Sequence, residues 1–361
     1  MSELTGKERI SRQLKHLPVD RIGVFEAFWQ YTMRNWENQG KVPPNACPVE
    51  HFGLDMLLCE PCNMRIHPQA QDQVISEDED TVTLLDGNGA TLRRHKKHDT
   101  TPEHVDFSIK ERKQWLELAK PFLTADTATR LNREAYRKAR QRAAEKGLFF
   151  CWVGVNVFEL MHPICGHENM LLGMALDPEW IEDMVNTYSE LILQLQQELF
   201  AAEGPPDGIW YWDDMGFRGR PFMSPDMYRE LIMPAHRKTI DYAHSLGLPV
   251  IMHSCGFIEP LLPYMVEAGI DALQAIEIKA GMDLLRIDKQ FGEKIALIGG
   301  LDARPIANND LPGITRELES KIPIVKKNRG FIMHSDHSIP ESTEYETYLY
   351  FKETGLKLGT Y

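Results

Sequence analysis

The sequence lacks any long apolar run, and no stretch approaches the roughly 18 apolar residues that a membrane-spanning helix needs. Residues 1–9 also lack the apolar core of a signal peptide. Cysteine is scarce: the six cysteines of the 361-residue chain are irregularly spaced, which disfavours a disulfide framework. These absences predict a cytoplasmic protein in a reducing compartment, with no membrane partner.

Positive charge is also scarce. The net charge is −13, and the densest basic run, residues 93–98, is short. Nucleic acids need clustered Lys and Arg, so the sequence predicts no nucleic-acid partner. The Gly-Gly-Leu-Asp stretch at 299–302 lacks the spacing of a dinucleotide or phosphate-binding loop, which gives nucleotide binding little support. Composition leaves homo-oligomerisation open.

Apolar runs that read as buried strands alternate with amphipathic helical patterns, which predicts a parallel sheet. Eight strands are the number that closes a TIM (β/α)8 barrel, and we expect one domain over residues 1–361, with about 42–106 as an insertion or lid. An open, doubly wound sheet is the alternative. The eight candidate strands are 21–25, 55–59, 149–153, 208–212, 248–252, 272–276, 295–298 and 330–333.

Polar side chains follow the predicted strands at one end. In a TIM barrel the carboxyl ends of all strands lie on one face, where the loops build the active site. Residues spread over 300 positions would therefore become neighbours. They are Glu26, Asn156, Asp213, Asp214, His253, Cys255, Glu277, Asp302, His334, Asp336 and His337.

His253 and Cys255 are the strongest metal-ligand candidates. Their i, i+2 spacing at a strand end places an imidazole and a thiolate on one side. Glu277 follows the next predicted strand and His337 the last one. Both would complete a zinc shell, with Glu277 as an exchangeable ligand that leaves a position for substrate. Asp214 is predicted to orient a metal-bound histidine or to act as a general base.

Two other clusters compete weakly as metal sites. Cys59 and Cys62 resemble half a zinc site, but no second cysteine pair has the required spacing. His162, Cys165 and His167 fall in a helical pattern, where they would not share one face. We expect helix-packing and capping roles for that second group.

Several segments together resemble the uroporphyrinogen decarboxylase superfamily of TIM barrels. The resemblance is closest to the branch of cobalamin-dependent methyltransferases, whose zinc pattern is His-x-Cys followed by a distal Cys. His253 and Cys255 match the first part, whereas Asp336-His337 stands where that branch has Gly-Cys. The matching segments are 5–24, 105–110, 213–216 (Asp-Asp-Met-Gly), 253–256 (His-Ser-Cys-Gly), 269–272, 276–277, 299–302 and 330–340.

The resemblance implies a zinc methyltransferase that works with a corrinoid carried by a partner protein, since the chain lacks the Asp-x-His-x-x-Gly corrinoid motif; residues 241–247 come nearest. The arginine-rich segment that holds a tetrapyrrole in the decarboxylases is missing from 25–31. Aromatic residues expected near the mouth favour a methoxylated aromatic donor, O-demethylated by the enzyme, over a thiol acceptor. They are Trp29, Tyr31, Trp152, Phe158, Trp210 and Trp212.

Two alternatives remain. A decarboxylase-type lyase would use Asp214 and His337 as acid and base on a small carboxylated substrate. A barrel retained as a binding subunit is the non-enzymatic reading, and it fits less well because so many ionisable residues end the strands on one face.

Overall fold

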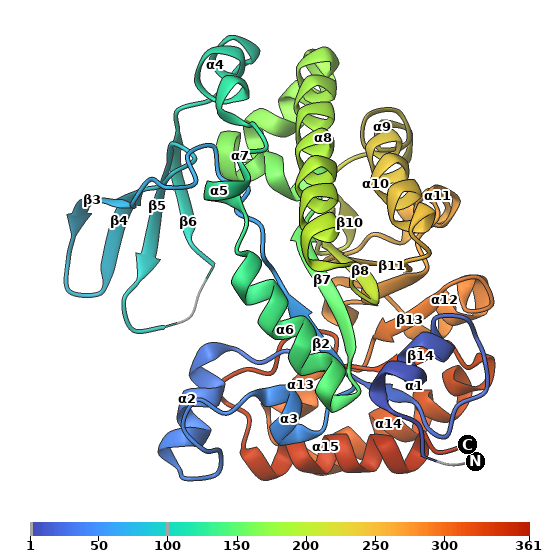
Figure 1. Cartoon of the computed structure of the whole chain (residues 1–361). Helices are drawn as coiled ribbons and strands as arrows, with labels where there is room; N and C mark the ends of the chain where they lie inside the picture. The colour runs from blue at the N-terminus through green and yellow to red at the C-terminus, as the bar shows by residue number, and fades with distance from the viewer. Residues whose placement is uncertain (1–2, 99–100) are drawn as a thin grey trace.

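One parallel sheet of eight strands forms the centre of the structure (Figure 1). The computed structural model describes residues 3–98 and 101–361; residues 1–2 and 99–100, the latter pair inside the predicted insertion, lie outside the described residues. The strand order is β1-β14-β13-β12-β11-β8-β7-β2. Their bounds are β1 Gly23–Val24, β2 Met56–Cys59, β7 Phe149–Val155, β8 Gly208–Trp212, β11 Val250–Ser254, β12 Ala272–Ala275, β13 Ala296–Gly299 and β14 Phe331–Met333.

The two edges of this sheet meet at Asp55. Its backbone N–H, directly before β2, donates to the carbonyl of Val24 in β1 at 2.8 Å. Its carboxylate accepts from the Val24 N–H, also at 2.8 Å. The barrel is therefore nearly closed, which confirms the predicted TIM barrel and contradicts the open-sheet alternative. Each predicted strand overlaps one observed strand.

A buried ion-pair network holds this seam. Arg9, which is 2% exposed, contacts Asp55 (Nη1 to Oδ1, 2.5 Å) and Asp20 (Nε to Oδ1, 2.8 Å). Arg21 contacts the other oxygen of Asp55 at 2.8 Å. The guanidinium groups offset the cost of burying the Asp55 carboxylate, because a buried charge needs charged or hydrogen-bonding partners.

Alternate residues of the barrel strands face two apolar layers, as the period of two in a strand requires. Phe25, Trp210 and Ile251 belong to the cluster inside the barrel. Tyr211 and Val250 pack in the larger cluster between the sheet and the helices. Because side chains fill the interior, the strand ends and their loops are what remains to build a site.

Helices cover the outside of the barrel. Among the described residues, none of them combines the length and apolarity that crossing a membrane would take. The α-helices are α1 Gly6–Gln13, α2 Gln30–Asn38, α3 Pro48–Phe52, α4 Arg112–Leu118, α5 Thr127–Arg130, α6 Arg133–Lys146, α7 Val157–Leu176, α8 Pro178–Glu203, α9 Pro225–Met227, α10 Met233–Ser245, α11 Leu262–Ala268, α12 Leu284–Phe291, α13 Ala303–Ala307, α14 Leu311–Val325 and α15 Tyr345–Leu358. Short 3-10 or π segments occupy Lys120–Phe122, Tyr228–Ile232, Glu259–Leu261, Ile278–Ala280 and Lys326–Asn328.

A separate antiparallel sheet lies between β2 and α4 in the chain. It contains β3 Gln73–Glu77, β4 Thr81–Leu85, β5 Ala90–His95 and β6 Glu103–Phe107, in that order. Asp86 stabilises the hairpin turn between β4 and β5, since its carboxylate accepts from the N–H groups of Asn88 and Ala90. Figure 1 shows this sheet projecting from the barrel beside α4 and α7.

Helix α7 is kinked, which contradicts the continuous helix predicted through 162–167. Gly166 has φ 75° and ψ 156°, far from helical values. A Cβ atom at this position would lie 2.5 Å from Cε2 of Phe107 on β6, so glycine permits both the backbone conformation and the close contact. The kink rotates the side chains that follow it relative to those before it.

Candidate metal centre

The two strongest ligand candidates lie at the C-terminal end of β11. His253 is in the strand and Cys255 follows it. Gly256 then turns with φ 83°, and a Cβ atom there would lie 2.1 Å from the carbonyl carbon of Gly216. Glycine is therefore required for this turn. Cys255 Sγ lies 3.3 Å from Nε2 of His253, so the predicted pair does converge.

Asp214, after β8, joins this pair. Its Oδ1 lies 3.1 Å from His253 Nε2 and accepts from the Cys255 N–H at 2.7 Å. One ligand atom from each of the three residues lies within 4.8 Å of the others. The neighbouring Asp213 has a structural role instead, because it is fully buried and accepts from the Glu159 N–H at 2.7 Å.

Gln274 orients His253, and the sequence analysis did not identify it. The two residues are partners in the β11–β12 register, and Gln274 Oε1 accepts a hydrogen bond from His253 Nδ1. This contact leaves Nε2 as the nitrogen that faces Asp214 and Cys255, in the way that outer partners fix metal-binding histidines. The available signal was one polar residue in the apolar run 272–276.

Charges in this trio are set by burial and by mutual contact. Burial raises the pKa of the Cys255 thiol, and nearby His253 offsets the effect only partly. Burial opposes the charge of Asp214, but the hydrogen bond and charge of His253, together with the hydrogen bond from the Cys255 N–H, outweigh it and lower the carboxyl pKa. A cation at this position would favour the thiolate, which is the form that binds metals.

The other two predicted ligands lie near the trio but outside it. Glu277 Oε2 accepts from the Gly256 N–H at 2.7 Å, and its Oε1 lies 3.4 Å from Lys279 Nζ. His337 is half-buried and stacks on Trp29 at a ring distance of 6.1 Å. Burial lowers the His337 pKa, with a further contribution from Lys279, so its imidazole is neutral at pH 7.

Glu26 occupies the end of β1 on the same face. It is 5% exposed and accepts from Ser335 Oγ at 2.9 Å, from the Ser335 N–H at 3.2 Å and from the Ala27 N–H at 3.1 Å. Burial raises its pKa to about 8 against these hydrogen bonds, and the charge of Asp336 adds to the rise. Buried His334 lies 3.4 Å away through Nε2, which makes this a second polar group at the mouth.

A cavity of about 390 Å³ opens beside Cys255 and Glu277. This volume suits a small molecule. Of the three cationic side chains that line it, Arg304 pairs with Asp302 at 2.5 Å and Lys279 lies 3.4 Å from Glu277, so Arg218 is the cation with no ion pair among the described residues. A free guanidinium favours an anionic ligand. The lining residues are Gly216, Phe217, Arg218, Cys255, Gly256, Glu277, Lys279, Ala280 and Arg304.

The aromatic residues predicted near the mouth fall into two groups. Trp152, Phe158 and Trp210 are buried in the apolar clusters, so the prediction is wrong for them. Trp29, Tyr31 and Trp212 are partly exposed. Trp212 contacts His253 edge-on at a ring distance of 4.3 Å. Strand residues of both kinds look alike in sequence, because aromatic side chains serve core and site equally.

Known proteins resemble this chain in both sequence and fold. The sequence is 27% identical over 155 residues to a methylated-thiol–coenzyme M methyltransferase of Methanosarcina mazei, a match that covers 43% of this chain and 39% of that protein. The chain thus spans about two fifths of the length of this curated relative.

A solved methyltransferase from Methanosarcina mazei has the same fold, with a TM-score of 0.69, 16% identity and 98% coverage of both chains. The sequence model for uroporphyrinogen decarboxylase (URO-D) matches residues 100–355, which contain every member of the trio. The chain therefore belongs to the uroporphyrinogen decarboxylase family.

Proposed function

We propose that the protein is a zinc-dependent methyltransferase that passes a methyl group between a small substrate and the corrinoid of a partner protein. The observation that carries the proposal is the convergence of His253, Cys255 and Asp214 beside a cavity at the barrel mouth. The predicted ligands Glu277 and His337 lie close enough to be tested as further donors. Methyltransferase relatives support the reaction class.

The donor set fits zinc. An imidazole nitrogen, a thiolate and a carboxylate oxygen are the three ligand types that Zn²⁺ takes in proteins, and a catalytic site keeps one position open. Gln274 already holds His253 with Nε2 toward the other donors. When bound, the metal would supply Lewis acidity, which lowers the pKa of a substrate thiol or stabilises an alkoxide or phenoxide leaving group.

The charge of the cavity favours a small anionic substrate. Arg218 would hold an anionic group, while Cys255 and Glu277 line the same cavity. A thiol acceptor fits this arrangement better than a bulky methoxylated aromatic, because Phe217 is the one aromatic residue among the lining residues. The relative that acts on methylated thiols points the same way.

O-demethylation of a methoxylated aromatic remains the second candidate. Trp29 beside His337 and Trp212 beside His253 are the observations that favour it. Whether the methyl group moves to or from the corrinoid, we expect the corrinoid to be carried by a separate protein. The nearest approach to a corrinoid motif, residues 241–247, lies mostly within α10, where His244 contacts Asp271 at 2.8 Å.

Zinc content and methyl transfer together test the proposal. Protein purified without chelator should carry zinc and should transfer methyl from a methylated corrinoid protein to coenzyme M faster than to an uncharged thiol of similar size. Cys255→Ser should carry one zinc ion fewer than the parent and should lose transfer, whereas Cys47→Ser, a change at the start of α3, should change neither the zinc content nor the transfer. Full transfer by Cys255→Ser would contradict the metal role.

Two further measurements separate the remaining candidates. Demethylation of 2-methoxybenzoate with a reduced corrinoid protein, without any thiol activity, would favour the second candidate. Metal-free protein that releases CO₂ from a small carboxylic acid would instead establish the lyase, in which Asp214 and His337 act as acid and base.

A further inference from the structure

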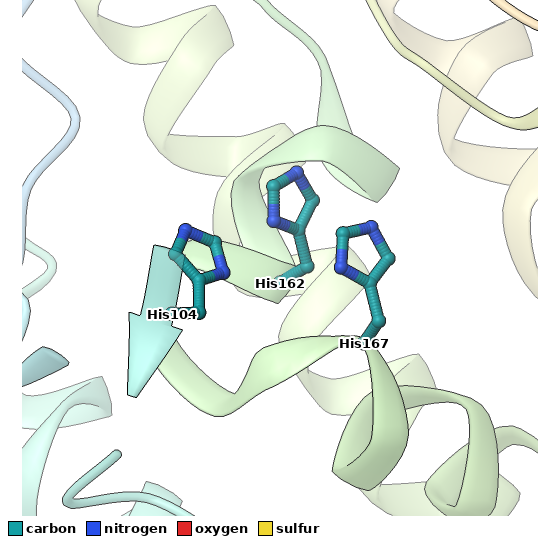
Figure 2. Close-up of side chains that lie close together, drawn as sticks. All are labelled: His104, His162 and His167. Atoms are coloured by element: carbon teal, nitrogen blue, oxygen red, sulfur yellow. The ribbon is translucent and has the colours of Figure 1, made fainter. Parts of the chain in front are cut away.

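Three histidines form a cluster apart from the candidate metal centre. His104 lies on β6 of the inserted sheet, while His162 and His167 lie on α7, on opposite sides of its kink. One ring nitrogen from each residue lies within 4.8 Å of the others. Figure 2 shows the three rings turned toward one another.

The kink at Gly166 creates this cluster. In a continuous helix, residues five apart point about 140° away from each other. Here the rings of His162 and His167 instead stack at 4.1 Å with an interplanar angle of 17°. Phe107, which packs against Gly166, also belongs to β6, so the same contact that requires the glycine brings His104 to within 5.8 Å of the His162 ring.

The ring nitrogen atoms of the cluster are in a state that can bind a metal ion. His162 Nε2 contacts Glu159 Oε1 at 3.0 Å, and its Nδ1 is buried without a hydrogen-bond partner among the described residues. Such a carboxylate contact fixes the tautomer of a metal-binding histidine. Burial lowers the pKa of His167 to about 4 and lowers that of His104, so both rings are neutral at pH 7.

We propose that His104, His162 and His167 bind a divalent transition-metal ion, with Zn²⁺ as the expected occupant. Three imidazole nitrogens are an established donor set for zinc, and they leave one position free. The ion would join two segments that are distant in sequence, the last strand of the inserted sheet and the helix that follows β7. It would thereby fix the insertion beside the barrel mouth.

Glu159 connects this second site to the first. One of its oxygens contacts His162, and the other accepts from the Asp214 N–H at 3.2 Å. Metal binding at the histidine cluster would hold Glu159 in place and, through it, the loop that carries Asp214. The inference does not depend on the proposed function, because it concerns metal binding by residues outside the trio.

The test uses protein without a histidine tag in which the first site is disabled by His253→Ala and Cys255→Ser. Equilibrium dialysis against Zn²⁺, and against Co²⁺ as a spectroscopic probe, should find one ion per chain. Its Co²⁺ spectrum should lack a sulfur charge-transfer band. Adding His104→Ala should weaken binding by more than the ~10- to 100-fold that loss of a supporting contact costs. The matched control is His98→Ala, which changes an exposed histidine after β5. It should bind Zn²⁺ as tightly as the protein that carries only His253→Ala and Cys255→Ser.

Amide hydrogen exchange shows where on the chain the Zn²⁺ ion binds. Zn²⁺ should slow exchange of the amides of β6 in the background protein and should not do so in the His104→Ala variant. Absence of stoichiometric binding in the background would overturn the proposal, as would equal affinity in the His104→Ala and His98→Ala variants. His104 lies on β6 of the inserted sheet, outside the barrel sheet, so His104→Ala should leave the barrel folded.

Discussion

Replacing Gln274 with methionine removes the hydrogen-bond acceptor of His253 while keeping a side chain of similar length. Gln274 is 2% exposed and makes its contact with His253 Nδ1 across two paired strands. Loss of such a supporting contact costs about 10- to 100-fold in metal affinity, or about 1.4–2.7 kcal/mol. We therefore expect the zinc dissociation constant of Gln274→Met to rise by this factor, measured by competition with a chromophoric chelator.

Gln274→Glu distinguishes the effect of losing the hydrogen-bond acceptor from the effect of changed packing. Glutamate keeps an oxygen in the same place, so this variant should bind zinc at least as tightly as the parent. His104→Ala should be present in every protein compared, so that zinc bound at the histidine cluster does not contribute to the measured affinity. Zinc binding by Gln274→Met that equals that of the parent would show that Gln274 does not orient His253 for the metal. Equal weakening by both substitutions would show that Gln274 matters for packing alone.

Three further predictions concern ligands and stability. If His337 is a ligand, then in a His104→Ala background His337→Ala should lose zinc, His337→Cys should retain more of it, and His334→Ala should match that background in elemental analysis. Arg9→Met should lower the free energy of unfolding in urea by about 3–5 kcal/mol, because it leaves Asp55 buried with one guanidinium fewer. Glu26 has a folded-state pKa of about 8 against an ordinary 4.5, so the folded state retains a proton that the unfolded state loses. Stability should therefore fall as pH rises from about 4.5 to about 8, and Glu26→Gln should flatten that slope in thermal melts.

The sequence predicted the barrel because its strands are buried on both faces and therefore stand out as apolar runs. It predicted the pairing of His253 with Cys255 because that geometry depends on two neighbouring positions. Gln274 escaped prediction because its partner is set by the register between β11 and β12, which no local pattern records. A carboxylate after a strand can be structural or functional, and only the observed contacts separate Asp213 from Asp214.

The histidine cluster escaped prediction for a related reason. A helical pattern places His162 and His167 on different faces, and one residue, Gly166, overrides that pattern. Phe107, which packs against this glycine, comes from a sheet about 60 residues earlier in the chain. Local periodicity describes what a segment prefers alone, and here a tertiary contact changed the outcome.

The seam of the barrel has a consequence for how the chain is made. β1 pairs with β14, and Glu26 receives its hydrogen bonds from Ser335, 309 residues later. At 5–20 residues per second, a ribosome needs roughly 15–60 s to cover that distance. Through this interval the edge of β1 that pairs with β14 has no partner strand, whereas β8 and β11, which carry the trio, are made earlier in the chain. Nascent chains of this protein therefore expose a pairing edge for most of their synthesis, which is when a chaperone is most needed.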